Sequence, residues 1–214
     1  DRLFTFYGIV KFAEFLEDPD YEAYADYWLE TFVEEGTHRY ISFQNYLMGG
    51  LPGAYRYIQG RPLTDEETFQ FYVDELIYEH PKDDLGVVQH PTQLGGRIWV
   101  DCLMAVNPFL SMAAIVLNDP SLHDISINQY LGMETQLFDT QAGLFHQSKN
   151  FGESGCVTTD HWSRGNGWAL IGLIEILQYL PEDHPQYFDM VSRLAGFAEV
   201  LAPLQAESGM WRQN

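Results

Sequence analysis

A loop that combines two tryptophans, an arginine and two glycines is the stretch of the sequence best suited to chemistry. It runs from His161 to Trp168 and precedes an apolar helical pattern. An indole face beside a guanidinium suits an anionic sugar, because the ring covers the apolar sugar face and the arginine binds a carboxylate through two parallel hydrogen bonds. We expect Trp162, Arg164 and Trp168 to bind such a ligand, and Asn166 to be the N-cap of the helix. The alternative is that the tryptophans anchor the core and the glycines form a tight turn.

A single carboxylate within an apolar run is the second candidate. Asp101 follows Trp99 and Val100 at the start of a predicted helix. Such neighbours desolvate a carboxyl group and raise its pKa, so that it can act as a general acid near neutral pH. The alternative is an ordinary N-cap or first-turn acid. His146, which ends a glycine-led extended link, is a third candidate, although a lone histidine in such a place is more often structural.

Composition and charge exclude several classes of binding partner. The 214 residues are 46% hydrophobic and carry a formal net charge of −20, which predicts a globular protein and argues against nucleic acid and acidic membrane surfaces. No apolar run reaches the roughly 18 residues of a membrane helix. Two cysteines make no disulfide framework, and the seven histidines have no paired ligand spacing, so we expect no metal site. The sequence leaves open a cytoplasmic, periplasmic or secreted location.

Hydrophobic periodicity predicts helices in pairs along the whole chain. The predicted ranges are 3–16, 20–34, 45–59, 65–79, 100–117, 122–139, 167–180 and 185–205. Gly36, Gly86, Gly143 and Gly209 end successive pairs, at intervals of 50, 57 and 66 residues. Repeated units of two helices and a glycine-led link are typical of stacked helical hairpins. The sequence therefore predicts four hairpins in an all-α fold, as an open solenoid or as part of a closed ring.

Four motifs occur in register along the chain, at 99–110, 143–146, 162–168 and 179–185. Together they resemble those of the unsaturated rhamnogalacturonyl hydrolases of glycoside hydrolase family 105 and the related unsaturated glucuronyl hydrolases of family 88. That family fold is an (α/α)6 toroid of six helical hairpins. The resemblance implies that residues 1–214 form one toroid domain with about four of the six hairpins. We expect the natural polypeptide to continue past Asn214, and an incomplete N-terminus stays open.

The resemblance also implies an activity. These enzymes remove a 4,5-unsaturated uronic acid from the non-reducing end of lyase-generated oligosaccharides by hydrating the C4=C5 double bond. Asp101 matches the catalytic aspartate, which protonates C4 and then helps water to add at C5. The expected sugar contacts are His146, Trp162, Arg164, Trp168 and Trp99. The resemblance implies no cofactor.

One motif departs from the family pattern. The second hairpin usually carries another acidic residue, but the corresponding stretch holds Gln44 and Asn45. An amide can hydrogen-bond a sugar hydroxyl but cannot take up a proton. We expect both amides to contact substrate, and a non-catalytic sugar-binding or scaffold protein stays as an alternative. An inverting glycosidase is less favoured, because Asp101 has no acidic partner in a matching link.

Four hairpins would leave apolar flanks at both ends of the array. Large exposed apolar patches are uncommon on soluble monomers, so we expect either further hairpins or self-association to cover them. The apolar residues predicted for the C-terminal flank are Leu173, Ile174, Ile176, Leu177, Leu194, Phe197 and Val200.

Overall fold

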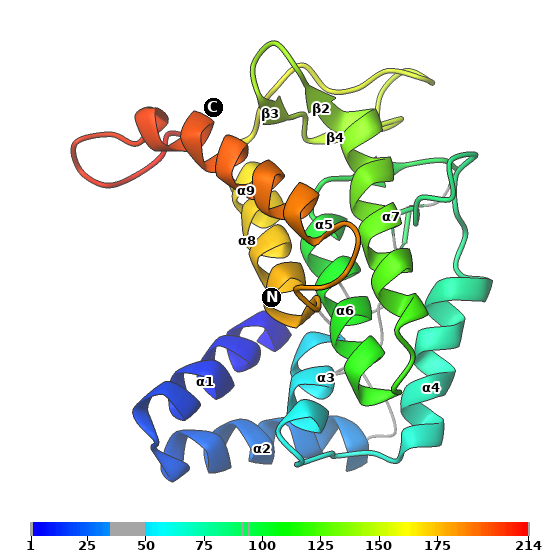
Figure 1. The fold of residues 1–214 in the computed structure, drawn as a ribbon, viewed down its shortest axis with the longest axis vertical. Helices are drawn as coiled ribbons and strands as arrows, with labels where there is room; N and C mark the ends of the chain where they lie inside the picture. The colour runs from blue at the N-terminus through cyan, green and yellow to red at the C-terminus, as the bar shows by residue number, and fades with distance from the viewer. Residues whose placement is uncertain (1, 35–49, 91, 94, 214) are drawn as a thin grey trace.

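The computed structural model describes residues 2–34, 50–90, 92–93 and 95–213, and these residues are largely helical (Figure 1). A π-helical stretch, Glu75–Glu79, extends α4, and a 3-10 turn, Ala202–Leu204, follows α9. The α-helices are α1 (Arg2–Leu16), α2 (Pro19–Glu34), α3 (Leu51–Ile58), α4 (Glu66–Asp74), α5 (Cys102–Ala105), α6 (Asn107–Val116), α7 (Ser121–Leu137), α8 (Ser163–Tyr179) and α9 (Tyr187–Leu201).

The described helices follow one another as four hairpins, as the sequence predicts. They are α1–α2, α3–α4, α6–α7 and α8–α9, and α3 packs against both α1 and α6 while α6 packs against α8. The helix predicted at 100–117, with an interruption at Pro108, is divided instead at Val106 into α5 and α6. Pro108 occupies the first turn of α6, where its missing N–H breaks no helical hydrogen bond.

Within the part of the chain that the structure describes, four short strands form two antiparallel pairs at one end of the helices (Figure 1). Strand β1 (Ile98–Trp99) pairs with β4 (Ser148–Lys149), and β2 (Phe138–Asp139) pairs with β3 (Leu144–Phe145). The glycine-led links predicted after the hairpins are confirmed at Gly86, Gly143 and Gly209, which have φ values of +77°, +69° and +81°. Gly36 lies outside the described residues.

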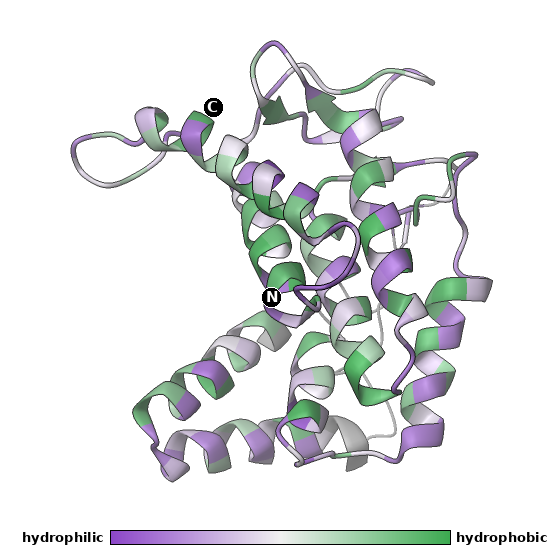
Figure 2. Ribbon diagram, viewed as in Figure 1, coloured by the Kyte–Doolittle hydropathy of each residue, from purple (hydrophilic) through white to green (hydrophobic). Residues whose placement is uncertain are grey.

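One contiguous apolar core runs through all four hairpins, from Phe6 to Phe197. Helix α6, which packs against α8, is largely hydrophobic, whereas α2 and α4 alternate hydrophilic and hydrophobic positions (Figure 2). Gly172 allows α8 to pack closely on α5, because a Cβ there would lie 2.6 Å from the carbonyl oxygen of Leu103.

The predicted C-terminal flank needs correction. Leu173 and Ile176 are fully buried and Phe197 is 5% exposed, whereas Ile174 is 38% exposed. Helix α1 covers part of α8, because Phe4 packs edge-on against Trp168 with ring centres 5.1 Å apart. Six exposed aromatic residues gather instead on the first hairpin. They are Phe12, Phe15, Tyr21, Tyr24, Tyr27 and Trp28.

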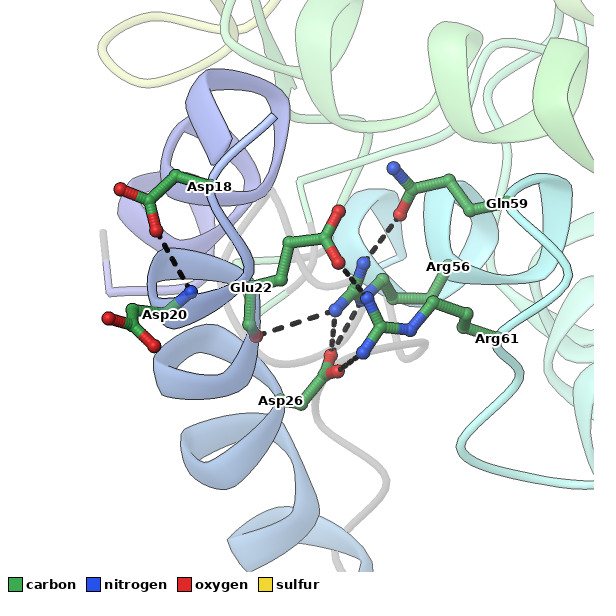
Figure 3. A network of polar contacts seen from close by, with 7 residues as sticks. All are labelled: Asp18, Asp20, Glu22, Asp26, Arg56, Gln59 and Arg61. Carbon is green, nitrogen blue, oxygen red and sulfur yellow. Dashed lines mark hydrogen bonds and ion pairs between the residues drawn. The ribbon is translucent and has the colours of Figure 1, made fainter. Parts of the chain in front are cut away.

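A polar network joins the first hairpin to the second (Figure 3). Arg56, which is fully buried, donates from Nε to Asp26 Oδ1 at 2.7 Å, and Arg61 donates to Asp26 Oδ2 at 2.7 Å. Glu22 pairs with Arg61 as well. A buried guanidinium requires such partners, so this network has a structural role. Among the described helices, none has the length and hydrophobicity needed to cross a bilayer.

Candidate active site

Asp101 occupies a buried position two residues after the end of β1. The Val100 N–H donates to the Gln147 carbonyl oxygen at 3.0 Å, which ties the start of α5 to the link that carries His146. Asp101 is 6% exposed, and its Oδ1 has no hydrogen-bond partner among the described residues. Asp101 occupies the N-cap position of α5, as the alternative predicts, but its side chain makes no capping hydrogen bond.

Burial raises the pKa of Asp101 to about 7, and the positive charge of Arg164 opposes that rise. A carboxylic acid normally titrates near pH 4, so this side chain stands out as an acid that is still protonated close to neutral pH. Its dry surroundings are the physical cause, since low polarity disfavours the charged form. Asp101 therefore has the protonation state that a general acid requires.

The aromatic loop forms the beginning of α8. Trp162 is 6% exposed, and the Arg164 guanidinium lies over its ring at 4.2 Å from the centroid. A Cβ at Gly165 would lie 2.6 Å from a Val100 methyl group, so only glycine allows the first turn of α8 to approach the Asp101 segment this closely. Trp162 thus supports Arg164, and the exposed guanidinium is the group available to an anion.

Asn166 is not the N-cap of α8, which corrects the sequence prediction. The helix begins at Ser163, and Asn166 is buried in its first turn. Its Oδ1 accepts the Phe145 N–H at 2.8 Å and its Nδ2 donates to the Phe145 carbonyl oxygen at 3.0 Å. The amide therefore completes the backbone hydrogen bonding of β3 and fixes the strand next to His146. An amide within an apolar helix was the one signal in the sequence for this role.

His146 lies in a cluster with two residues that the sequence analysis did not connect with it. Its ring stacks on His161 with centroids 4.7 Å apart, and His161 Nε2 lies 3.2 Å from Asp139 Oδ2. Nδ1 of His146 is buried without a partner among the described residues. These three side chains could hold a metal ion. Linear spacing cannot show this group, because its members come from β2, the link after β3 and the residue pair before α8.

The ring contacts of Trp99 and Trp168 are made with residues outside this cluster. Trp99 stacks on His90 with ring centres 4.9 Å apart, and Trp168 packs against Phe4 of α1. Both rings are half-buried. Their contact with a sugar stays a prediction.

A cavity of about 620 Å³ opens beside the start of α8. Asp101 is not among the residues that line this cavity. Arg164 connects the cavity with Asp101, because it lines the cavity and its positive charge acts on the Asp101 carboxyl group. The remaining polar lining comes from His161, Ser163, Asn166 and Arg212. Gln44 and Asn45 lie outside the described residues, so their role stays a prediction.

Stacked helical hairpins of this kind form the fold of the helical-toroid glycosidases. A solved structure of a possible GH105 member from Salmonella enterica superposes with a TM-score of 0.80 at 25% identity, over 97% of this chain and 56% of that one. The Glycosyl Hydrolase Family 88 model matches residues 3–214. The chain therefore belongs to this family.

Two curated relatives are hydrolases of unsaturated sugars. The unsaturated rhamnogalacturonyl hydrolase YesR of Bacillus subtilis is 22% identical over 212 residues, which are 97% of this chain and 61% of that protein. An unsaturated 3S-rhamnoglycuronyl hydrolase of Formosa agariphila is 30% identical over 124 residues, or 54% of this chain and 33% of that protein. The chain thus spans less than two thirds of the length of these relatives.

Proposed function

We propose that this protein removes a 4,5-unsaturated uronic acid from the non-reducing end of lyase-generated oligosaccharides by hydrating the C4=C5 double bond. The observation that carries the proposal is Asp101, a buried carboxyl group whose pKa lies at about 7. The family and the names of the curated relatives support the same class of reaction.

In the proposed reaction Asp101 donates its proton to C4 of the unsaturated ring. Positive charge then develops at C5 and is shared with the ring oxygen. The Asp101 carboxylate next accepts a proton from the water that adds at C5, which restores the acid and forms a hemiketal. Opening of this hemiketal releases the remaining oligosaccharide, so one water is consumed in each cycle.

Arg164 has two parts in this proposal. Its exposed guanidinium, held over Trp162, pairs with the uronate carboxylate and orients the double bond toward Asp101. The same positive charge lowers the pKa of Asp101, so it stabilises the carboxylate that forms when the proton leaves. His146, on the link bonded to Val100, is proposed as a further sugar contact.

The proposed substrate carries the uronate on rhamnose. Rhamnose is common to the names of both curated relatives, rhamnogalacturonyl and 3S-rhamnoglycuronyl. Rates of hydration of both kinds of rhamnose-containing oligosaccharide, compared with the rate for an unsaturated glycosaminoglycan disaccharide, test whether the enzyme prefers rhamnose next to the uronate.

Ultraviolet absorbance of the conjugated uronate tests the function directly, because only hydration of the double bond removes it. We expect the absorbance to fall with the full 214-residue chain and to stay constant with Asp101→Asn. Calorimetric binding of the oligosaccharide without any loss of absorbance would overturn the proposal in favour of a non-catalytic sugar-binding protein.

A further inference from the structure

A second cavity, of about 230 Å³, lies between α7 and α9 and is closed at one end by β2 and β3. It shares no described lining residue with the 620 Å³ cavity beside α8. Leu144 lines the larger cavity and Phe145 the smaller one, and consecutive strand residues point to opposite faces, so β3 separates the two. We propose that the smaller cavity binds one neutral pyranose ring. The proposal is independent of the proposed hydrolase activity.

The wall of this cavity is aromatic. Phe138, Phe145 and Phe197 line it and pack edge to face, with ring centres 5.0, 5.6 and 6.4 Å apart. A pyranose presents a face of C–H groups that such rings can cover, while its hydroxyl groups point outward from the edge of the ring. Pockets for drug-sized ligands begin at roughly 300 Å³, so the smaller volume suits a single sugar ring.

Tyr130 contributes a polar group without a partner to the cavity. The residue is 1% exposed, and its hydroxyl makes no hydrogen bond with another residue of the described chain. Burial raises the pKa of Tyr130, as does the Glu134 carboxylate, while Arg193 lowers it, and the net rise keeps the hydroxyl protonated. A buried hydroxyl without a partner costs free energy, and a sugar oxygen that accepts its proton would supply the missing hydrogen bond.

The charged side chains that line the cavity, Glu134 and Arg193, pair with each other. Arg193 donates from Nη1 to Glu134 Oε2 and from Nε to Asp189 Oδ2, the latter at 3.0 Å. Nη2 of Arg193 and Oε1 of Glu134 have no hydrogen-bond partner within the described ranges, so a donor and an acceptor stay available side by side. Such a pair suits two adjacent sugar hydroxyl groups. Because the two charges cancel, the site favours a neutral ring over a uronate.

Gly196 keeps the cavity open. It lies within α9, where glycine makes a helix less stable than alanine does. A Cβ at this position would meet no atom within 4 Å, so close packing does not require glycine here. The residue lines the cavity, and a larger side chain would extend into it. The glycine therefore weakens its helix at a position where a side chain would narrow the cavity.

Saturation-transfer NMR of the full chain with the methyl glycosides of glucose, galactose and rhamnose tests the site. We expect saturation to pass from the phenyl rings to the C–H groups of the sugar, and methyl galacturonide to bind no more tightly than methyl galactoside. Tyr130→Phe keeps the ring and removes only the hydroxyl, so it should weaken binding about 2- to 10-fold, the effect of one neutral hydrogen bond. The melting temperature should not fall, because the folded chain loses no hydrogen bond.

Two leucine substitutions distinguish the two cavities. Gly196→Leu should abolish this binding, whereas Gly167→Leu, which fills the larger cavity, should keep it. Both glycines have open space at the Cβ position and leucine is a good helix former, so both variants should keep the helical circular dichroism of the original chain. Binding of none of the three sugars would overturn the proposal, as would binding that Gly167→Leu abolishes and Gly196→Leu keeps. Tighter binding of the galacturonide that is lost in Gly196→Leu would also overturn it, because the cavity would then be an anion site.

Discussion

The protonation state of Asp101 depends on its dry position, so the site has a predictable pH dependence. The acid form is the proton donor, and it is depleted as the pH rises through the pKa of about 7. We therefore expect kcat/KM for hydration to fall above about pH 7. Asp101→Asn should lower kcat at least about 100-fold, the lower end of the contribution of a general acid. Turnover retained in this variant would exclude Asp101 as the acid.

Asp101 also makes the free energy of unfolding depend on pH. The free energy should fall as the pH rises, whereas an ion-paired aspartate has the opposite effect. The pKa of Asp101 is raised in the folded state, so the folded protein holds a proton that the unfolded chain releases above about pH 4. Stability consequently declines between about pH 4 and pH 7, by up to about 4 kcal/mol for this group. Asp101→Asn should remove this decline and be more stable than the original chain at pH 8. Urea unfolding at pH 5 and pH 8 measures the difference.

Substitutions of Arg164 and of Trp162 should affect different properties, ligand binding and stability respectively, although both residues belong to one loop. Arg164 is exposed, so Arg164→Ala should weaken binding of an unsaturated uronide while the melting temperature changes little. Trp162 is buried, so Trp162→Ala should cost about 3–5 kcal/mol of stability. Calorimetry and thermal unfolding measure the two quantities. Unchanged affinity in Arg164→Ala would show that the guanidinium only holds the loop.

At the scale of elements, the periodicity of hydrophobic residues predicted most helices to within a few positions. It failed at α8, which begins at Ser163 and not near 167. Gly165 and Gly167 favour a loop or tight turn in the sequence, because glycine readily adopts positive φ values. In the structure the missing Cβ of Gly165 allows the helix to lie against Val100, and this tertiary contact outweighs the local propensity. The cluster of Asp139, His146 and His161 could not be predicted from the sequence for a similar reason, because only tertiary packing brings its three segments together.

Glycine packing also gives a test of how α8 is placed. A Cβ at Gly172 would lie 2.6 Å from the Leu103 carbonyl oxygen, so Gly172→Ala should push α8 away from α5 and cost about 1–3 kcal/mol. Gly196 in α9 has open space at the same position, and Gly196→Ala should stabilise its helix by about 0.5–1 kcal/mol. Denaturant unfolding of both variants measures these opposite effects. A neutral Gly172→Ala would show that the close approach is dispensable.

At the scale of the whole molecule, the first hairpin carries the largest concentration of exposed aromatic residues. Phe15 is 82% exposed, Tyr27 64% and Phe12 51%. Such a surface drives association through burial of apolar area, while a net charge of −20 opposes it through repulsion. Self-association of this 214-residue chain should therefore strengthen with salt, because ions screen the repulsion and leave the apolar contribution in place.

Sedimentation velocity across protein and salt concentrations checks this expectation. The weight-average mass should rise with concentration at high salt, and the double variant Phe15→Ser, Tyr27→Ser should reduce the rise. Phe188 is 75% exposed on α9, so Phe188→Ser is a control of similar exposure on another hairpin. A mass that stays monomeric at all salt concentrations would contradict the prediction. A loss of association in Phe188→Ser alone would move the contact surface from the first hairpin to α9.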